Sequence, residues 1–286
     1  MLSNSFRQHR FIVLLILTVV IVSASLGVSA RPLSVRIDRW LEIRNLSGSV
    51  AAVQNGQVLQ AQVGQRISSI GDGIRTGPAS LARLAVDTQI GFVSVSENTD
   101  LRIIDIYTTQ RGGKVTKLDV ERGQARLFVR PFTHPESSFE MRTPSGINGV
   151  RGTDFGVAIQ PSGRSAVAVL EGGVSSEAEG AAVLVETGFQ SLTNPGEPPS
   201  PPVPATDETD LDVERLERRD RTNEESMVML QGHLSPYNLL IVEGETQDTS
   251  REGDFDLLLP LPANERFHVK VVTPLGTKQV YELVVP

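Results

Sequence analysis

The sequence has no cysteine among its 286 residues, and this absence is the first constraint on what the protein can be. Without cysteine there is no disulfide scaffold, no thiolate zinc site, no cysteine nucleophile and no lipid-modified cysteine behind an export signal. Positive charge is also scarce, because 27 Lys and Arg face 34 Asp and Glu, for a formal net charge of −7. Such a chain has no global basic field, so nucleic acid is not expected as a partner.

Catalytic groups are few and scattered. The histidines beyond the N-terminal segment are His134, His233 and His268, and no two of them have metal-ligand spacing. The sequence contains no Gly-x-Ser-x-Gly turn of a serine hydrolase. Closely spaced acids are concentrated in residues 207–225, where the charge pattern predicts a solvated segment. We therefore expect a protein that is not an enzyme and holds neither cofactor nor metal; a glycosidase without a motif is the remaining enzymatic alternative.

The N-terminal segment, residues 1–30, has the three-part organisation of a secretory signal peptide. Arg7 and Arg10 precede a long apolar run, and Val28 and Ala30 occupy the −3 and −1 positions for cleavage after Ala30. The alternative is a retained anchor, because residues 11–28 are just long enough to span a bilayer. Both interpretations predict an exported protein, periplasmic or elsewhere in the cell envelope, that contacts membrane only through residues 11–28 if these are not removed.

Most of the chain has the pattern of an all-β protein. Short apolar runs are separated by glycine-rich turns, and Asn55-Gly56 is a strong hairpin signal. In one run, Ala125, Leu127 and Val129 alternate with polar residues, which predicts one buried face. This spacing predicts a sandwich or jelly-roll-like domain over residues 44–196. The predicted strands are residues 49–53, 58–63, 81–86, 91–95, 101–107, 115–120, 125–129, 139–142, 154–159, 165–170 and 182–186.

Residues 197–225 are predicted to link this domain to a smaller one. Proline is so frequent in residues 194–204 that we expect an extended polyproline spacer, with a proline-recognition ligand as the sharper alternative. Residues 207–225 carry acids first and arginines later, which predicts a solvated helix or arm, or a partner-binding helix. Residues 226–286 are predicted to form a small immunoglobulin-like sandwich. Its predicted strands are residues 228–230, 239–242, 255–259, 267–272 and 280–285.

Three segments of the larger domain resemble the FecR domain. They are residues 64–77 (GQRISSIGDGIRTG), 93–103 (VSVSENTDLRI) and 139–155 (FEMRTPSGINGVRGTDF), and residues 169–174 resemble a later strand of that family. The order of the segments makes the set more specific than any one of them. The residues that carry the resemblance are Gly71, Asp72, Arg75, Thr76, Asn98, Thr99, Thr143, Pro144, Val150, Arg151, Gly152, Thr153, Phe155, Glu171 and Gly172.

We expect these motif residues to be structural. Asp72 lies between two glycines, so its carboxylate should accept backbone N–H groups of a turn; a metal-ligand role is the rival interpretation. Arg75 and Arg151 should tie loops together through carbonyls or through an acid such as Asp154 or Glu171, with anion binding as the alternative. Thr143-Pro144 should fix an extended backbone. Gly149 and Gly152 should permit sharp backbone excursions.

The resemblance implies a function in the cell envelope. FecR-type proteins of iron-citrate systems receive a signal from an outer-membrane transporter and act on a sigma factor through a cytoplasmic segment. Only residues 1–10 precede the apolar run here, so no cytoplasmic sigma-regulatory segment is expected. The first hypothesis is an extracytoplasmic signal-receiving module that binds an envelope protein, for example by strand addition at a sheet edge. The alternative is a structural component that binds peptidoglycan or exported polysaccharide, which the small number of aromatic residues disfavours.

Overall fold

The computed structural model describes residues 39–87, 90–219 and 226–286, and every regular element in them is a β-strand. The predicted all-β class is therefore confirmed. Residues 38–286 form one compact unit. The predicted signal segment lies outside the described residues, and within those residues there is no helix of the length and hydropathy needed to cross a membrane.

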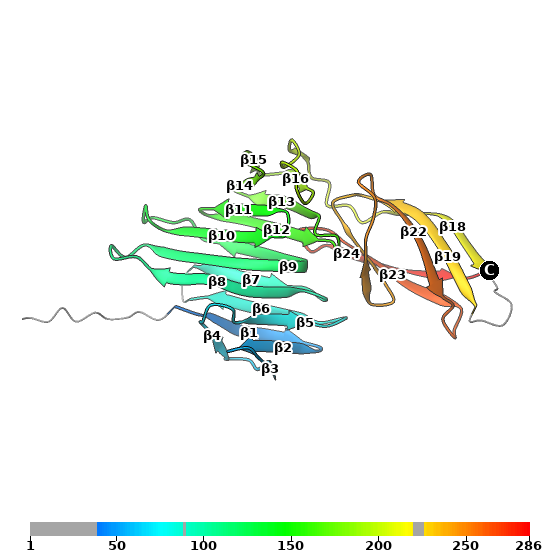
Figure 1. The fold of residues 1–286 in the computed structure, drawn as a ribbon, viewed down its shortest axis with the longest axis horizontal. Coiled ribbons are helices and arrows are strands. Elements are labelled where there is room, and N and C mark those ends of the chain that lie inside the picture. Colours follow the sequence, from blue (N-terminus) through cyan, green and yellow to red (C-terminus); the bar gives the residue numbers. More distant parts are fainter. Residues whose placement is uncertain (1–38, 88–89, 220–225) are drawn as a thin grey trace, which may run out of the picture. The chain divides into compact units, whose positions relative to one another are not determined.

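Residues 41–204 form two β-sheets (Figure 1). Sheet A contains, in spatial order, β4 (Arg66–Ile67), β1 (Leu41–Ser47), β6 (Leu81–Val86), β7 (Gly91–Val95), the second half of β9 (Lys114–Val129), β12 (Thr153–Ile159), β13 (Ser165–Glu171), β16 (Phe189–Thr193) and β17 (Val203–Pro204). Sheet B contains β3 (Gln57–Gln60), β2 (Val50–Gln54), β5 (Gly73–Thr76), β8 (Asp100–Thr108), the first half of β9, β10 (Ser138–Thr143), β11 (Gly146–Val150), β14 (Gly173–Ala178) and β15 (Ala181–Glu186).

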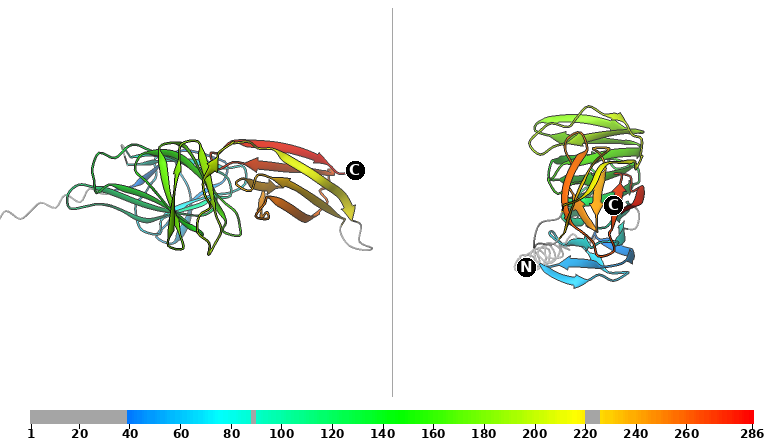
Figure 2. Two further views of the ribbon diagram at one scale, coloured as in Figure 1. Left: turned by 90° about the horizontal axis from the view of Figure 1, so that it is seen from above. Right: turned by 90° about the vertical axis from the view of Figure 1, so that its right-hand side faces the viewer.

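Both sheets gain strands in nearly the order of the chain, which crosses between them repeatedly. Figures 1 and 2 follow this order from the blue strands to the green ones. All pairs are antiparallel except β9 with β10. Alternate residues of both sheets join a single buried core, and the predicted face of Ala125, Leu127 and Val129 belongs to it. The larger domain is thus a sandwich in which two sheets share one core.

Strand β9 joins the two sheets. The sequence predicts two strands here, residues 115–120 and 125–129, but the structure has one strand that pairs first with β8 and then with β7 and β12. Gly123 lies at the change of sheet, with φ of 90°. A β-carbon at this position would lie 2.2 Å from Thr99 Oγ1, so both the backbone conformation and the close approach require glycine.

Seven strands of this sandwich were not predicted: β1, β4, β5, β11, β14, β16 and β17. The alternation in β11 and β14 is weak because polar side chains occupy inward positions: Asn148 and Ser176 are both buried. The Asn55-Gly56 turn is confirmed, since both residues have positive φ (50° and 77°) and Gln54 pairs with Gln57 across it.

Residues 211–284 form a second, smaller sandwich with its own core. One sheet has the order β18 (Leu211–Arg219), β19 (Met227–Leu234) and β22 (Asp254–Pro260), and the other β21 (Glu245–Gln247), β20 (Leu239–Val242), β23 (Arg266–Val272) and β24 (Lys278–Val284). The immunoglobulin-like topology stays a prediction.

The helix or arm predicted for residues 207–225 is wrong over Leu211–Arg219, which is strand β18 paired along its length with β19. Leu211, Val213 and Leu216 pack against the core of the small sandwich. A register shift between Val213 and Arg215 interrupts the period of two, and the broken alternation has the appearance of a thin helical stripe. The small sandwich therefore begins at β18, before the predicted boundary at residue 226.

The proline-rich stretch is also not a free spacer, because part of it forms the last strand of sheet A. Val203 and Pro204 pair with Gln190 and Phe189. On either side, Ser200 N–H donates to the Leu192 carbonyl and Ala205 N–H to the Gly188 carbonyl, both at 2.8 Å. Proline is tolerated in an edge strand because its missing N–H faces away from the sheet.

Candidate functional site

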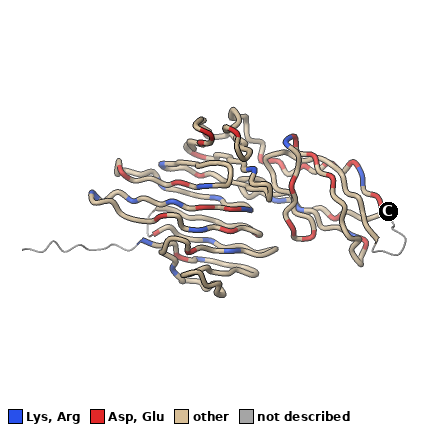
Figure 3. The backbone as a smooth tube through the Cα atoms, viewed as in Figure 1, with Lys and Arg blue, Asp and Glu red and all other residues tan. Residues whose placement is uncertain are grey.

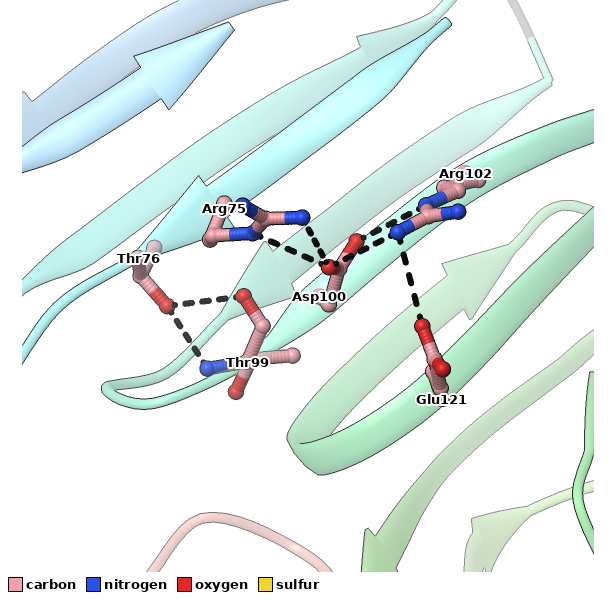
Figure 4. Close-up of polar contacts among 6 residues, drawn as sticks. All are labelled: Arg75, Thr76, Thr99, Asp100, Arg102 and Glu121. Carbon is pink, nitrogen blue, oxygen red and sulfur yellow. Dashed lines mark hydrogen bonds and ion pairs between the residues drawn. The ribbon is translucent and has the colours of Figure 1, made fainter. Parts of the chain in front are cut away.

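Motif residues from β5 and β8 meet on the outer face of sheet B around the carboxylate of Asp100 (Figure 4). The Asp100 side chain is 4% exposed. Arg75 donates from Nε and Nη2 to Asp100 Oδ2 at 3.0 and 2.9 Å, and Arg102 donates from Nε to Oδ1 and from Nη2 to Oδ2, both at 3.1 Å. Cross-strand register explains the arrangement, because Arg75 lies opposite Asp100 and Arg102 follows two residues later on the same face.

The charges of this cluster compensate one another. Burial alone would raise the pKa of Asp100, but the hydrogen bonds from Arg102 and Arg75 outweigh it and lower that pKa below its ordinary value. The bond to Asp100 raises the pKa of Arg102, whose Nη2 also lies 3.5 Å from Glu121 Oε2. Both shifts favour the charged forms of Asp100 and Arg102, so the cluster holds the strands together and is not an acid–base pair.

Beyond the Asp100 cluster, further charged residues lie next to one another on neighbouring strands of sheet B (Figure 3). Asp119 of β9 lies opposite Arg102 on one side and Arg142 on the other. Burial raises the pKa of Asp119, and the positive charge of Arg142 opposes this effect. One row further along, Lys117 Nζ lies 3.0 Å from Glu140 Oε2. Alternating charges of this kind stabilise neighbouring strands and leave little net charge on the face.

Two motif threonines fasten the turn before β8. Thr76 Oγ1 accepts the Thr99 N–H at 3.0 Å, and Thr99 Oγ1 accepts the Gln124 N–H at 3.0 Å. Asn98, the turn residue between Glu97 and Thr99, has φ of 54°. These contacts fix the end of β5, the turn and the bend of β9 to one another.

Gly71 and Asp72 form a turn beside the β2–β3 hairpin. Gly71 has φ of 85°. Asp72 accepts backbone N–H groups from Asn55 at 2.9 Å and from Ser69 at 3.2 Å, as the sequence predicts. The carboxylate therefore ties its own turn to the neighbouring hairpin. The described residues contain no group of three or more His, Cys, Asp or Glu placed to hold a metal.

Thr143 and Pro144 lie at the turn between β10 and β11. Thr143 ends β10 in an extended conformation, and Pro144 and Ser145 form the two-residue turn to Gly146. Thr143 Oγ1 lies 3.1 Å from Ser165 Oγ at the start of β13, so the turn is tied to sheet A.

The remaining motif residues fasten the crossing from β11 to β12. Val150 and Phe155 are buried in the core, and Thr153 Oγ1 donates to the Gly173 carbonyl at 3.0 Å. Gly152 has φ of 146°, and a β-carbon there would lie 2.5 Å from Pro131 Cα. Gly172 has φ of 87°, and a β-carbon there would lie 2.5 Å from the Gly152 carbonyl oxygen.

One expectation about this motif is confirmed and two need correction. Arg151 donates to the Pro135 carbonyl at 3.1 Å, which is the carbonyl contact expected for it, and the acid named as its alternative partner, Asp154, pairs with Arg126 at 2.9 Å. Glu171 is exposed and makes no ion pair within the described part of the chain. Gly149 makes no sharp excursion, because it lies inside β11 and is paired on both sides.

The comparisons with known proteins identify the segment that these clusters share. The sequence model of the FecR protein family matches residues 72–175. This chain carries a FecR domain. The match begins at Asp72 and includes the Asp100 cluster and the β11–β12 crossing, but not β1 to β3 or the small sandwich.

Solved structures that resemble part of this chain are distant. Two crystal structures, at 1.65 and 2.50 Å resolution, are of a protein from Parabacteroides distasonis classed as an anti-sigma factor, and they share 19% and 20% sequence identity with this chain. Their TM-scores are 0.40 and 0.38, and the match covers 46% of this chain and 59% of that protein. A search of curated protein sequences finds no match.

One turn of the FecR domain also contacts the small sandwich. Glu97 binds Lys270 of β23 and accepts the Ala79 N–H at 2.9 Å. The Asn98 side chain donates to the Gly244 carbonyl at 2.8 Å. Sequence reasoning did not anticipate this contact, because nothing in the spacing of residues 97 and 270 links them.

A second feature that sequence reasoning missed is the free edge of sheet B at β3. Residues 45–65 contain no charged side chain, so the β2–β3 hairpin carries neither blue nor red in Figure 3. All four residues of β3 are exposed, Val58 by 60% and Leu59 by 45%. Val63, just beyond the strand, is also exposed. An exposed strand without charge or proline is a template for pairing with another chain.

Proposed function

We propose that this chain is an exported, non-enzymatic protein of the cell envelope whose FecR domain receives a signal by binding an extended segment of a partner protein along β3. The uncharged free edge of sheet B is the observation that carries the proposal. Strand addition gives affinity through main-chain hydrogen bonds, and the alternating side chains give specificity. The family match supports a signalling role, and the predicted signal peptide or anchor supports the location.

The register of the hairpin determines which backbone groups a partner strand would meet. Gln54 and Gln57 flank a two-residue turn, and Ala61 N–H donates to the Val50 carbonyl at 3.0 Å. Hydrogen-bonded pairs alternate in an antiparallel ladder, so Val58 and Gln60 direct their N–H and C=O groups away from β2. These two residues therefore offer the free edge of the strand.

The other edges of the two sheets are less suited to pairing. Sheet A ends in β4 and β17, each of two residues, and β17 contains proline. The far edge of sheet B, β15, follows Glu179 and ends at Glu186, and charged residues at an edge oppose strand addition. Strand β3 is thus the edge without any of these protections.

Site-specific photo-crosslinking in the native envelope tests the proposal. A photoreactive residue at Gln57 of the full chain should give one protein adduct, and one at Glu186 should not. Gln60→Pro removes an outward N–H while leaving the β2–β3 bonds intact, so the adduct should disappear. Leu59→Thr keeps every backbone N–H and should retain it. An adduct that survives Gln60→Pro, or no adduct at Gln57, would overturn binding at this edge.

Export is tested separately by fractionation. The proposal predicts the chain in the periplasmic or inner-membrane fraction, with Arg31 as the first residue if the segment is cleaved. Recovery in the cytoplasm with the segment intact would refute the location.

A further inference from the structure

The outer face of sheet A gathers aromatic residues that are far apart in the sequence. Phe92 of β7 lies directly opposite Phe128 of β9, and the same row continues through Ala85 to Glu42 and then to Arg66. Trp40, two residues before Glu42, lies under the Arg66 guanidinium at 4.1 Å from the ring centre. Phe128 is 41% exposed.

Arginines surround these rings. Arg83 lies over Phe92, 4.6 Å from the ring centre, and Arg130 follows Phe128 by two residues, directly after the end of β9. Both are exposed, and neither forms an ion pair within the described ranges. The remaining arginines of the face do have carboxylate partners: Arg44 and Arg66 share Glu42, and Arg126 pairs with Asp154.

The acids of this face do not neutralise it. Arg44, Arg66, Arg83, Arg126 and Arg130 outnumber the carboxylates near them, which are Glu42, Asp154 and, opposite Asp154, the exposed Glu171. A fourth acid, Asp87, is buried and is bound by Arg39 at 2.7 Å. In a chain with a net charge of −7, the face is a local positive region, and it complements a negatively charged ligand.

A pocket of about 460 Å³ opens between these groups. Its lining includes Arg44, Arg83, Phe92 and Arg130, the small residues Ala85 and Gly91, and one acid, Asp87. The space is sufficient for one or two sugar rings, with guanidinium groups on both sides.

We propose that the outer face of sheet A binds an acidic polysaccharide, a chain of sugars that carry carboxylates. The apolar face of a sugar ring packs on Phe128 and the edge of Phe92, and Arg83 and Arg130 bind the carboxylates through paired hydrogen bonds. Aromatic rings with flanking guanidinium groups suit a carboxylated sugar better than an acidic peptide, which offers no flat apolar face. The proposal does not depend on strand addition at β3.

The test measures binding of the full chain, in a neutral detergent, to immobilised polygalacturonate. Dextran tests binding to sugar without charge, and polyglutamate tests binding to carboxylates without sugar. Polygalacturonate should bind, and the other two should bind at least about tenfold more weakly. The double variant Arg83→Gln/Arg130→Gln should weaken binding by about tenfold or more, and Phe128→Ala by about fivefold.

Matched controls separate this face from general charge and apolar surface. Arg215→Gln on β18 removes one positive charge elsewhere, where the double variant removes two, and Leu184→Ala on β15 removes an exposed apolar side chain of sheet B. Neither should change binding. Circular dichroism confirms that each variant is folded. Absence of binding, equal binding of polyglutamate or dextran, or equal weakening by Arg215→Gln would overturn the proposal. Gln60→Pro should leave polysaccharide binding unchanged, which distinguishes the two proposals.

Discussion

Replacing the buried Asp100 carboxylate by an amide, Asp100→Asn, should destabilise the FecR domain by about 2 kcal/mol. The substitution keeps the shape of the side chain but leaves Arg75 and Arg102 without their anion. Removing one partner of a buried pair costs about 3–5 kcal/mol, and a hydrogen bond to a charged group contributes about 1.5–3 kcal/mol. The two arginine side chains are 41% and 40% exposed, so water solvates them in the variant, and the lower part of this range applies.

The effect should depend on pH. Because the folded-state pKa of Asp100 lies below its ordinary value of 3.8, the ionised carboxylate stabilises the folded state. That contribution is complete well above pH 3.8 and is lost as the pH falls through the folded-state pKa. The difference in unfolding free energy between wild type and Asp100→Asn should therefore be largest at neutral pH and narrow in acid.

Urea unfolding of the full chain at pH 7 and at several values down to pH 3 measures both quantities. Glu121→Gln is the matched control, because Glu121 is exposed and lies 3.5 Å from the same Arg102; it should change stability by less than about 0.5 kcal/mol. The reasoning fails if Asp100→Asn equals wild type at pH 7, or if the gap between them does not change with pH.

Three further predictions concern the stability of the fold. Gly123→Ala should lower the unfolding free energy by about 3 kcal/mol, measured by urea denaturation, because φ is 90° and the new β-carbon would meet Thr99. The control Gly180→Ala, at a turn with open space, should lower it by about 1 kcal/mol. A fragment starting at residue 226 should lack a cooperative thermal transition that one starting at residue 206 shows, because only the longer fragment includes β18. Glu97→Gln should destabilise by about 2 kcal/mol, since Lys270 loses its buried partner, and calorimetry should then resolve separate unfolding of the small sandwich.

The strands that the sequence predicts best have uniformly apolar inward positions. Residues 81–86 and 91–95 are found with the predicted bounds, because valine, leucine and alanine alternate cleanly there. Strands with buried polar residues, such as β11 and β14, break the pattern and were missed. Strand β18 was misread for a related reason: a register shift at Val213 displaces the apolar period by one residue, and no local signal distinguishes this from a weak helix.

The sequence did not predict the long-range strand pairings that bring the residues of the candidate sites together. The prediction of Asp72 as a turn acceptor is confirmed by its bond from Ser69, three residues away, whereas its bond from Asn55 in the neighbouring hairpin was not predicted. The partner of Arg75 was not identified, although Asp100 lies only 25 positions away, because register across β5 and β8 determines it. The aromatic face of sheet A depends on three such registers, so residues 40, 92 and 128 appear unrelated in the sequence. The scarcity of aromatic residues argued against a sugar site, whereas their convergence argues for one.

The FecR motif residues stabilise the fold, and we expect ligand recognition to depend on surface residues outside the motif. Asp72, Thr76, Thr99 and Asp100 all use their polar atoms on the chain's own backbone or arginines, and Gly152 and Gly172 are required by close backbone contacts. These residues therefore stabilise the fold and leave the choice of ligand to other positions. The β3 edge lies before the matched segment, and the arginines and phenylalanines of sheet A point outward from strands whose inward faces form the core. Changes at either surface therefore leave the core intact, and it is there that a difference in ligand between two proteins of this fold should be sought.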